Sequence, residues 1–194
     1  MKSIKTFSFS SIVTTVAAVT FVAILTGCAS APQKNTEDRN LLESEINVAL
    51  TKFFAEAPNA QLIVRSALGV LVCPTITKAG FIIGGEGGTC AMQINGRTME
   101  YYRAAGFKAG LLAGAEKYSL VLVFNDANTL ANFRSGTRNW QTGGNLSVAV
   151  AKKGAGGGFN TKTMGTTTTA FVYGQKGLMG DISIDGSTFK KLVD

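Results

Sequence analysis

CAMQINGRTMEYY, residues 90–102, is the stretch that decides how this chain folds. At its centre, Asn95 and Gly96 separate two short runs of β-forming residues. Asn and Gly accept the positive φ angles that a tight hairpin turn requires. The stretch therefore predicts two antiparallel strands that meet at residues 95–96.

The sequence on both sides of this hairpin is typical of a sheet. From Gly69 onward it is rich in β-branched, aromatic and glycine residues, with turn signals every ten residues or so. Residues 118–124 are apolar except for Ser119, which fits a strand buried on both faces. Further strands are predicted at residues 146–151, 166–173 and 178–184.

Glycines recur inside these strand-like stretches and at their ends. Interior glycine weakens a strand, but it also lets a sheet coil strongly and close on itself. Close approach of a ligand to the backbone is the alternative explanation. No GxxxxGK[ST] motif follows residues 154–158, so a phosphate loop is not indicated there. The glycines considered are Gly84, Gly85, Gly87, Gly88, Gly106, Gly110, Gly114, Gly154, Gly156, Gly157 and Gly158.

Three helices are expected around the sheet. The first is amphipathic, is capped by Asn35 and ends before Pro58. Its apolar stripe, which Leu41 and Phe54 widen, either packs on the core or inserts into a membrane, and we favour the core. A shorter helix is expected at residues 61–67. The third follows a cap at Asp126, buries Leu130 and Phe133, and stops at residues 135–136.

The predicted fold class is therefore α+β. We expect a strongly curved, barrel-like or sandwich antiparallel β-sheet with an N-terminal amphipathic helix and one or two short additional helices. The length suits a single domain.

The N-terminal segment has the pattern of a secretory signal. Lys2 and Lys5 precede an uncharged apolar run at residues 12–25, which is short for a spanning helix. Residues 25–28, LTGC, resemble the bacterial lipobox, in which the cysteine thiol carries a lipid. We expect a signal peptide over residues 1–27, a lipidated tether over 28–35 beginning at Cys28, and a domain over 36–194. The alternative is cleavage elsewhere, with Cys28 an ordinary thiol.

The charge balance favours an acidic surface as partner. Without the signal the chain keeps 17 of its 19 basic residues against all 12 acidic ones, a formal +5. Basic groups close to anionic lipid gain about 1 kcal/mol each. No Lys/Arg run is longer than a pair and the chain is predicted to be secreted, so a nucleic-acid partner is not expected. Candidate lipid-binding residues, which ordinary solvation explains equally well, are Lys78, Arg103, Lys108, Lys152, Lys153, Lys162 and Lys176.

The residue types available for catalysis and metal binding argue against an enzyme. Histidine is absent, which removes the usual general base, and there is no CxxC pair for a metal. Asp126, Asp181 and Asp185 are the candidates for carboxylate catalysis, but they fit a helix cap and turns better. We expect no cofactor and no metal. Cys73 and Cys90 form either a disulfide or two buried free thiols.

Several blocks of sequence carry a family likeness: GVLVCP at 69–74, TKAGFIIGG at 77–85, AG at 105–106, GL at 110–111, AG at 113–114, SVAV at 147–150 with GAGG at 154–157, and YGQKGLMG at 173–180. Together these blocks resemble the SYLF-domain family, which includes bacterial lipoproteins and yeast actin-patch proteins. The chain departs from that family at Cys73, where relatives usually carry an aromatic residue. The likeness spans residues 62–192.

The resemblance implies a phospholipid-binding domain that uses an amphipathic N-terminal helix and basic residues, whereas actin binding belongs to the fungal branch. We therefore expect a membrane-anchored envelope lipoprotein with a non-catalytic domain for anionic phospholipids. Ala29 after Cys28 resembles lipoproteins sorted to the outer membrane, with the domain facing the periplasm or the cell surface. The alternative is an envelope protein–protein interaction scaffold.

Overall fold

The computed structural model describes residues 36–135, 140–142, 149–151, 167–177, 184 and 186–192 of the 194-residue chain. By its contacts the chain divides into two compact units, Met1–Asp38 and Arg39–Asp194. The second unit contains the whole sheet and the cores that pack on it. The predicted signal peptide, the tether and Cys28 lie outside the described residues.

The three expected helices are present. They are α2 (Thr36–Glu56), α3 (Ala60–Ser66) and α4 (Ala127–Arg134). The Asp126 carboxylate accepts a hydrogen bond of 2.7 Å from the backbone N–H of Thr129, which confirms the predicted cap of α4. In the part of the chain that the structure describes, no helix has both the length and the apolar character needed to cross a bilayer.

The predicted hairpin joins β1 (Gly69–Ile94) to β2 (Arg97–Phe124). Asn95 and Gly96 have φ angles of 52° and 72°, as the turn prediction requires. The strands are 26 and 28 residues long, so the expectation of a turn every ten residues is wrong. The pairing of β1 with β2 extends from one end of the strands to the other and is interrupted by three register shifts, one of them between Phe81 and Ile83.

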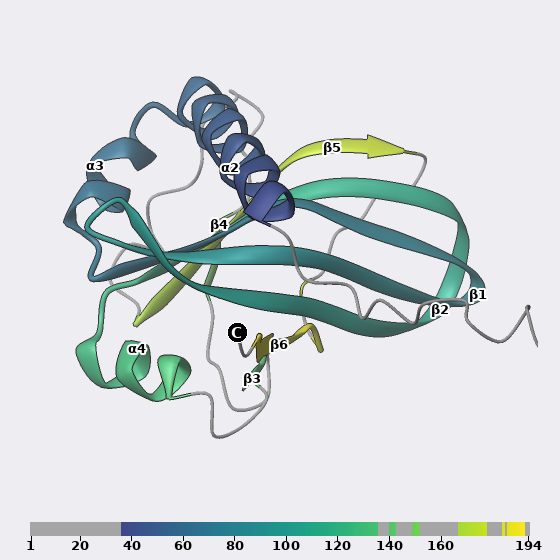
Figure 1. Ribbon diagram of the computed structural model, residues 1–194. Helices are drawn as coiled ribbons and strands as arrows, with labels where there is room; N and C mark the ends of the chain where they lie inside the picture. Colours follow the sequence, from purple (N-terminus) through teal and green to yellow (C-terminus); the bar gives the residue numbers. More distant parts are fainter. Residues whose placement is uncertain are drawn as a thin grey trace, which may run out of the picture. The chain divides into compact units, whose positions relative to one another are not determined.

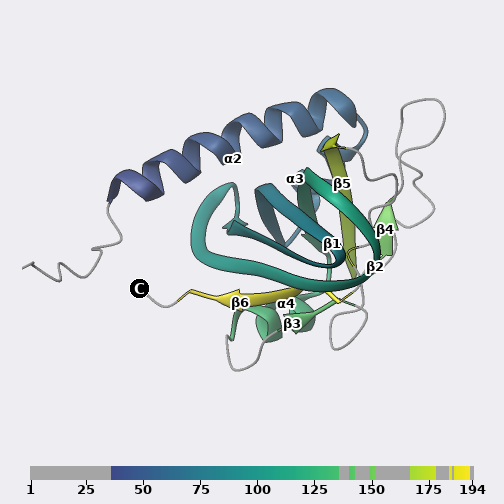
Figure 2. The same ribbon diagram turned by 90° about the vertical axis from the view of Figure 1, so that its right-hand side faces the viewer.

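The hairpin folds over in the middle of both strands (Figures 1 and 2). A Cβ atom on Gly80 would lie 2.3 Å from the Cα of Gly84, an approach that no other residue permits. Cys73 and Cys90 are 17 residues apart, yet their Cα atoms are 4.1 Å apart and a disulfide joins them. We call residues 80–84 of β1 and 106–114 of β2 the bend.

The remaining strands extend the sheet on both sides of β2. They are β3 (Trp140–Gln141), β4 (Ala149–Ala151), β5 (Thr168–Gly177) and β6 (Thr188–Lys191), in the order β3-β6-β2-β5-β4 with β1 paired to β2. The pairs are antiparallel except for β4 with β5.

These strands match the predictions in part. Strands β4 and β5 overlap the strands predicted at residues 146–151 and 166–173. The strand predicted at 178–184 falls almost wholly outside the described residues, and Ile184 is not in a strand. The short strands β3 and β6 were not predicted.

Two hydrophobic clusters cover the two faces of β2. Leu120, Leu122 and Phe124 pack with Phe133 of α4, whereas Val121 and Val123 pack with α2. This arrangement confirms that residues 118–124 form a strand buried on both faces. The α2 stripe packs on the core as favoured, through residues such as Ile46 and Phe53. Leu41, however, is 62% exposed and does not belong to the core.

The fold is thus α+β, with a strongly curled sheet, an N-terminal helix and two further short helices (Figure 2). The prediction of fold class is confirmed.

Candidate functional site

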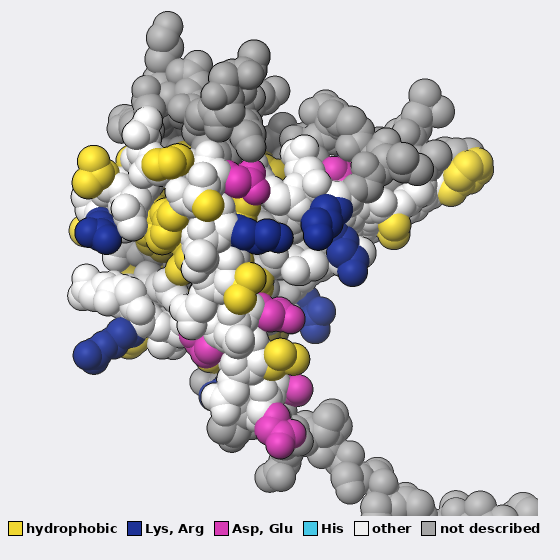
Figure 3. Space-filling model, turned by 90° about the horizontal axis from the view of Figure 1, so that it is seen from above, with side chains coloured by type: hydrophobic (Ala, Val, Ile, Leu, Met, Phe, Trp, Pro, Cys, Tyr) yellow, Lys and Arg dark blue, Asp and Glu magenta, His cyan; other side chains and the backbone are white. Residues whose placement is uncertain are grey.

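A pocket of about 320 Å³ lies where α2, β1, β2 and β5 meet. Three lysines from three different elements line it: Lys52 of α2, Lys117 of β2 and Lys176 of β5. Glu45 also lines the pocket, so the formal charge of the pocket is +2. Figure 3 views the α2 side and shows Lys and Arg side chains gathered near the middle of this face.

The strand register brings two of these lysines together. Lys117 and Lys176 are directly paired across β2 and β5, and both are exposed. Like charges opposite each other on neighbouring strands destabilise a sheet. Within the described residues, neither lysine forms an ion pair. A bound phosphate would offset this repulsion, because it places negative charge between the two ammonium groups.

The floor of the pocket is held in place by hydrogen bonds. The Ser119 hydroxyl donates to the carbonyl of Pro74 at 2.7 Å, and the Tyr173 hydroxyl donates to the carbonyl of Ala49 at 2.9 Å. Burial raises the pKa of Tyr173 above its ordinary range, so this phenol stays protonated and keeps donating. The bond from Tyr173 ties α2 to β5 and thereby fixes the position of Lys52 relative to Lys176.

The structure separates the other predicted lipid-binding residues. Lys78 is only 5% exposed and is paired in register with buried Glu116, so it is not presented to a surface. Arg103 is exposed but is paired with Lys190 of β6, not with a residue of the pocket. The backbone of Lys108 lies in the bend, paired with Gly84. Lys152, Lys153 and Lys162 lie outside the described residues.

Two lysines of the pocket, Lys52 and Lys117, were missed by the sequence predictions. Lys117 directly precedes the apolar run at residues 118–124, and this position was the signal that could have found it. Nothing in the sequence showed that Lys176 would pair with it, because a pairing between distant strands is set by the register of the whole sheet.

Two of the acidic residues in the part of the chain that the structure describes have clear structural roles. Asp126 caps α4, and buried Glu86 accepts hydrogen bonds from the hydroxyls of Tyr118 and Ser187. Burial raises the pKa of Glu116, although Lys78 opposes this shift. Asp181 and Asp185 lie outside the described residues. No cluster of three or more carboxylates or thiols that suits a metal occurs among the residues described.

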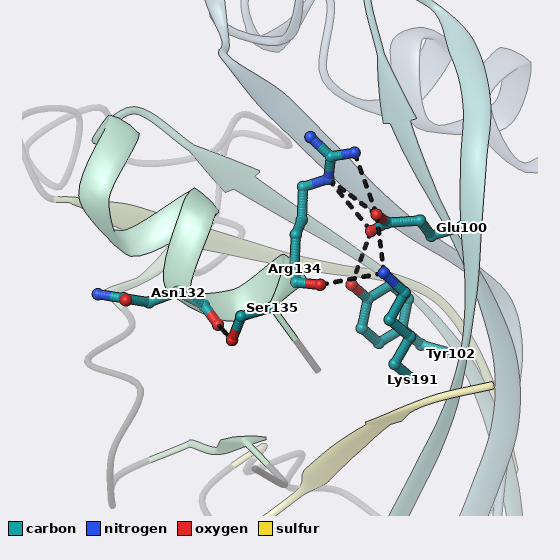
Figure 4. Close-up of polar contacts among 6 residues, drawn as sticks. All are labelled: Glu100, Tyr102, Asn132, Arg134, Ser135 and Lys191. Carbon is teal, nitrogen blue, oxygen red and sulfur yellow. Dashed lines mark hydrogen bonds and ion pairs between the residues drawn. The ribbon is translucent and has the colours of Figure 1, made fainter. Parts of the chain in front are cut away.

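A second polar network joins α4, β2 and β6 (Figure 4). Glu100 accepts hydrogen bonds from Arg134, from Lys191 at 2.9 Å and from Tyr102 at 2.9 Å. Burial alone would raise the pKa of Glu100, but these donors and the positive charge of Arg134 bring it below its ordinary value. Lys191 is therefore engaged in holding β6 in place.

Comparison with known proteins agrees with the resemblance noted in the sequence. Residues 105–194 match the model of the family Ysc84, described as "Las17-binding protein actin regulator". The chain is also similar to "Beta cell expansion factor A" of Aeromonas veronii, with 26% identity over 160 residues. That alignment covers 81% of this chain and 59% of the relative, so the chain spans about three fifths of the length of the curated relative. The match to the Ysc84 model confirms, over residues 105–194, the resemblance to SYLF domains noted in the sequence.

Proposed function

We propose that this SYLF domain is a non-catalytic module that binds the surface of anionic phospholipid membranes. The convergence of Lys52, Lys117 and Lys176 on one pocket is the observation that carries the proposal. Similarity to a family described by its binding activity supports it.

The chemistry of the pocket suits a phosphate headgroup. Lysine ammonium groups bind phosphate as point charges, and each basic group near an anionic bilayer contributes about 1 kcal/mol within a Debye length. Thr75, a residue with a hydroxyl, also lines the pocket beside the lysines. A headgroup oxygen can therefore meet both charge and hydrogen-bonding groups there.

We further propose that Cys28 carries a lipid and holds the domain beside the outer membrane, on its periplasmic or its external side. The LTGC motif at residues 25–28 supports this assignment. Intact-mass measurement of the protein from a Gram-negative host tests it. Acyl chains on the Cys28 thiol are expected, and a thiol without them contradicts the anchor while leaving the pocket untouched.

Vesicle sedimentation tests the binding function. The unit Arg39–Asp194 is compact by itself, so residues 29–194 are suitable without the anchor. They should sediment with acidic vesicles at low salt and be released at high salt, because exposed charges are screened. Replacing Lys52, Lys117 and Lys176 with Gln should weaken binding about 100-fold, since three contributions of about 1 kcal/mol are lost.

The control for this experiment is a triple variant with the same net charge. Arg65, Arg97 and Lys190 are exposed basic residues outside the pocket. Replacing them with Gln should weaken binding less than about threefold if the pocket provides the contacts. Equal losses in the two triple variants would mean that only net charge matters, and equal binding to acidic and neutral vesicles would contradict the electrostatic proposal.

The alternative function is a protein-interaction scaffold on the envelope. The description of the matching family as a protein-binding regulator favours keeping it. Cross-linking in cells would support this alternative if it recovered one stoichiometric partner through pocket residues, together with indifference to vesicles of every composition.

A further inference from the structure

The bend carries three large apolar side chains that the fold does not cover. Phe81 is 77% exposed, Ile83 is 57% exposed and Phe107 is 70% exposed. Single exposed apolar residues are common on proteins, but a group of them on one feature marks an interaction surface. Figure 3 shows hydrophobic side chains at the right-hand extremity of the molecule, the side on which Figure 1 shows the hairpin folding over.

The strand register makes these three residues neighbours. Phe81 is paired with Ala113, Ile83 with Ala109 and Phe107 with Gly85. All three therefore lie within a short length of the two-stranded ribbon.

The apolar group and the basic pocket share one face of β1. From residue 75 to residue 83 of this strand, exposure alternates: Thr75, Thr77, Ala79, Phe81 and Ile83 are exposed, whereas Ile76 and Lys78 are buried. Thr75 lines the basic pocket. Phe81 lies six positions further along the chain, which is at most about 20 Å along a strand.

A membrane surface matches this combination of chemistries. Its phosphate layer suits the lysines, and the apolar layer just below suits aromatic and aliphatic side chains. The two strands of the bend are hydrogen-bonded to each other. The peptide groups at the register shift between Phe81 and Ile83 and at the outer edges of the ribbon need other partners, and headgroups and water supply these at shallow depth.

Resting on the proposed function, we propose that the bend inserts Phe81, Ile83 and Phe107 into the headgroup–acyl boundary of the bilayer whose phosphates the pocket lysines bind. The lysines provide the salt-sensitive part of binding. The bend provides a part that persists at high salt, because burial of apolar surface does not depend on charge.

The test compares two triple serine variants of residues 29–194 on vesicles that contain anionic lipid. Replacing Phe81, Ile83 and Phe107 with Ser should abolish the binding that remains at high salt, a loss of about tenfold for each side chain. Binding at low salt should stay dependent on the pocket lysines. The control replaces Leu41, Leu62 and Met99 with Ser, since these are 62%, 76% and 57% exposed elsewhere, and should keep the salt-resistant binding.

A tryptophan probe measures insertion directly. The chain has one tryptophan, Trp140, which is 6% exposed in the core. In a Trp140→Phe background, Phe81→Trp should show a blue shift and quenching by lipids with brominated acyl chains. Unchanged thermal unfolding of each variant shows that the fold is retained.

The possible outcomes separate the two proposals. Suppose that the unmodified domain binds acidic vesicles, that the bend variant binds as tightly as the unmodified domain at low and at high salt, and that the probe is not quenched. Insertion is then wrong and headgroup binding stands. If the unmodified domain does not bind vesicles at all, the proposed function itself fails. A probe that is shielded only in the presence of a purified protein partner, and not by vesicles, would likewise overturn insertion.

Discussion

The hairpin of β1 and β2 has two regions with opposite surroundings. Where β1 begins and β2 ends, both faces are covered, and residues 120–124 are completely buried between α2 and α4. At the bend, the same two strands expose Phe81, Ile83 and Phe107 to solvent. We call the covered region the closed end.

This difference gives the two regions different roles: the closed end stabilises the fold, and the bend is available to contact a partner. Apolar residues at the closed end stabilise the domain, because they leave water when the chain folds. Apolar residues at the bend remain in water in the free domain, so they contribute little to its stability and remain available for a surface. The predictions below test this division, from the largest expected effect to the smallest.

The largest loss of stability is expected from Phe133→Ala in α4, the helix that packs on the closed end. The Phe133 ring is fully buried, with centroids 4.9 Å from both Tyr102 and Phe124. Removing it should lower the free energy of unfolding by about 3–5 kcal/mol, as measured by urea denaturation. The matched change Phe81→Ala at the bend should cost less than about 0.5 kcal/mol. Similar losses at the two sites would contradict the division.

The disulfide is expected to have the next largest effect. Cys73 and Cys90 are fully buried and hold together the two halves of the folded-over β1. Replacing both with Ser should destabilise the domain by about 3 kcal/mol, because the unfolded chain gains freedom over a 17-residue loop. A reductant should destabilise the unmodified domain in the same assay and leave the double variant unaffected. A double variant as stable as the parent would contradict this role.

Glu100→Gln should have a smaller, pH-dependent effect. The folded pKa of Glu100 is below its ordinary value of 4.5, so ionised Glu100 stabilises the fold. This contribution is fully present above pH 4.5 and is lost as the pH falls through the folded pKa. The variant should be about 1–3 kcal/mol less stable at neutral pH, and the difference should shrink in acid.

The measurement for Glu100 is chemical denaturation across a pH series. The conservative change Glu43→Gln, at a carboxylate that accepts hydrogen bonds from Thr98 and Tyr101, is a suitable comparison. A gap between Glu100→Gln and the parent that stayed constant down to strongly acid pH would show that the charge of Glu100 does not stabilise the fold.

The smallest effect concerns two glycines of the same hairpin. Gly96 has a φ of 72° in the turn, so Gly96→Ala should cost about 1 kcal/mol through backbone strain. At Gly85, beside the bend, an added Cβ would meet only the carbonyl oxygen of Gly106 at an ordinary 3.7 Å. Gly85→Ala should therefore change the melting temperature much less than Gly96→Ala does. The reverse order would mean that the bend carries strain that its backbone does not show.

Local features of this protein were determined by the sequence alone. Asn95 and Gly96 specify their turn, Asp126 specifies the start of α4, and the apolar run at 118–124 specifies a strand with two buried faces. Each depends on residues that are close in the chain, so conformational preference and hydrophobic pattern suffice. The family resemblance also depends on short blocks of sequence, and it is confirmed over residues 105–194.

The candidate site was decided by tertiary structure. Lys117 and Lys176 meet because β2 and β5 pair in one register, and Lys52 joins them because α2 packs across those strands. Lys78 was also a candidate lipid-binding residue from the sequence, yet in the folded sheet it is buried and paired with Glu116. The sequence left the pairing of Cys73 with Cys90 open, because only the folding-over of β1 brings the two cysteines together. Contacts between distant residues depend on the register and curvature of the whole sheet, which no short stretch of sequence determines.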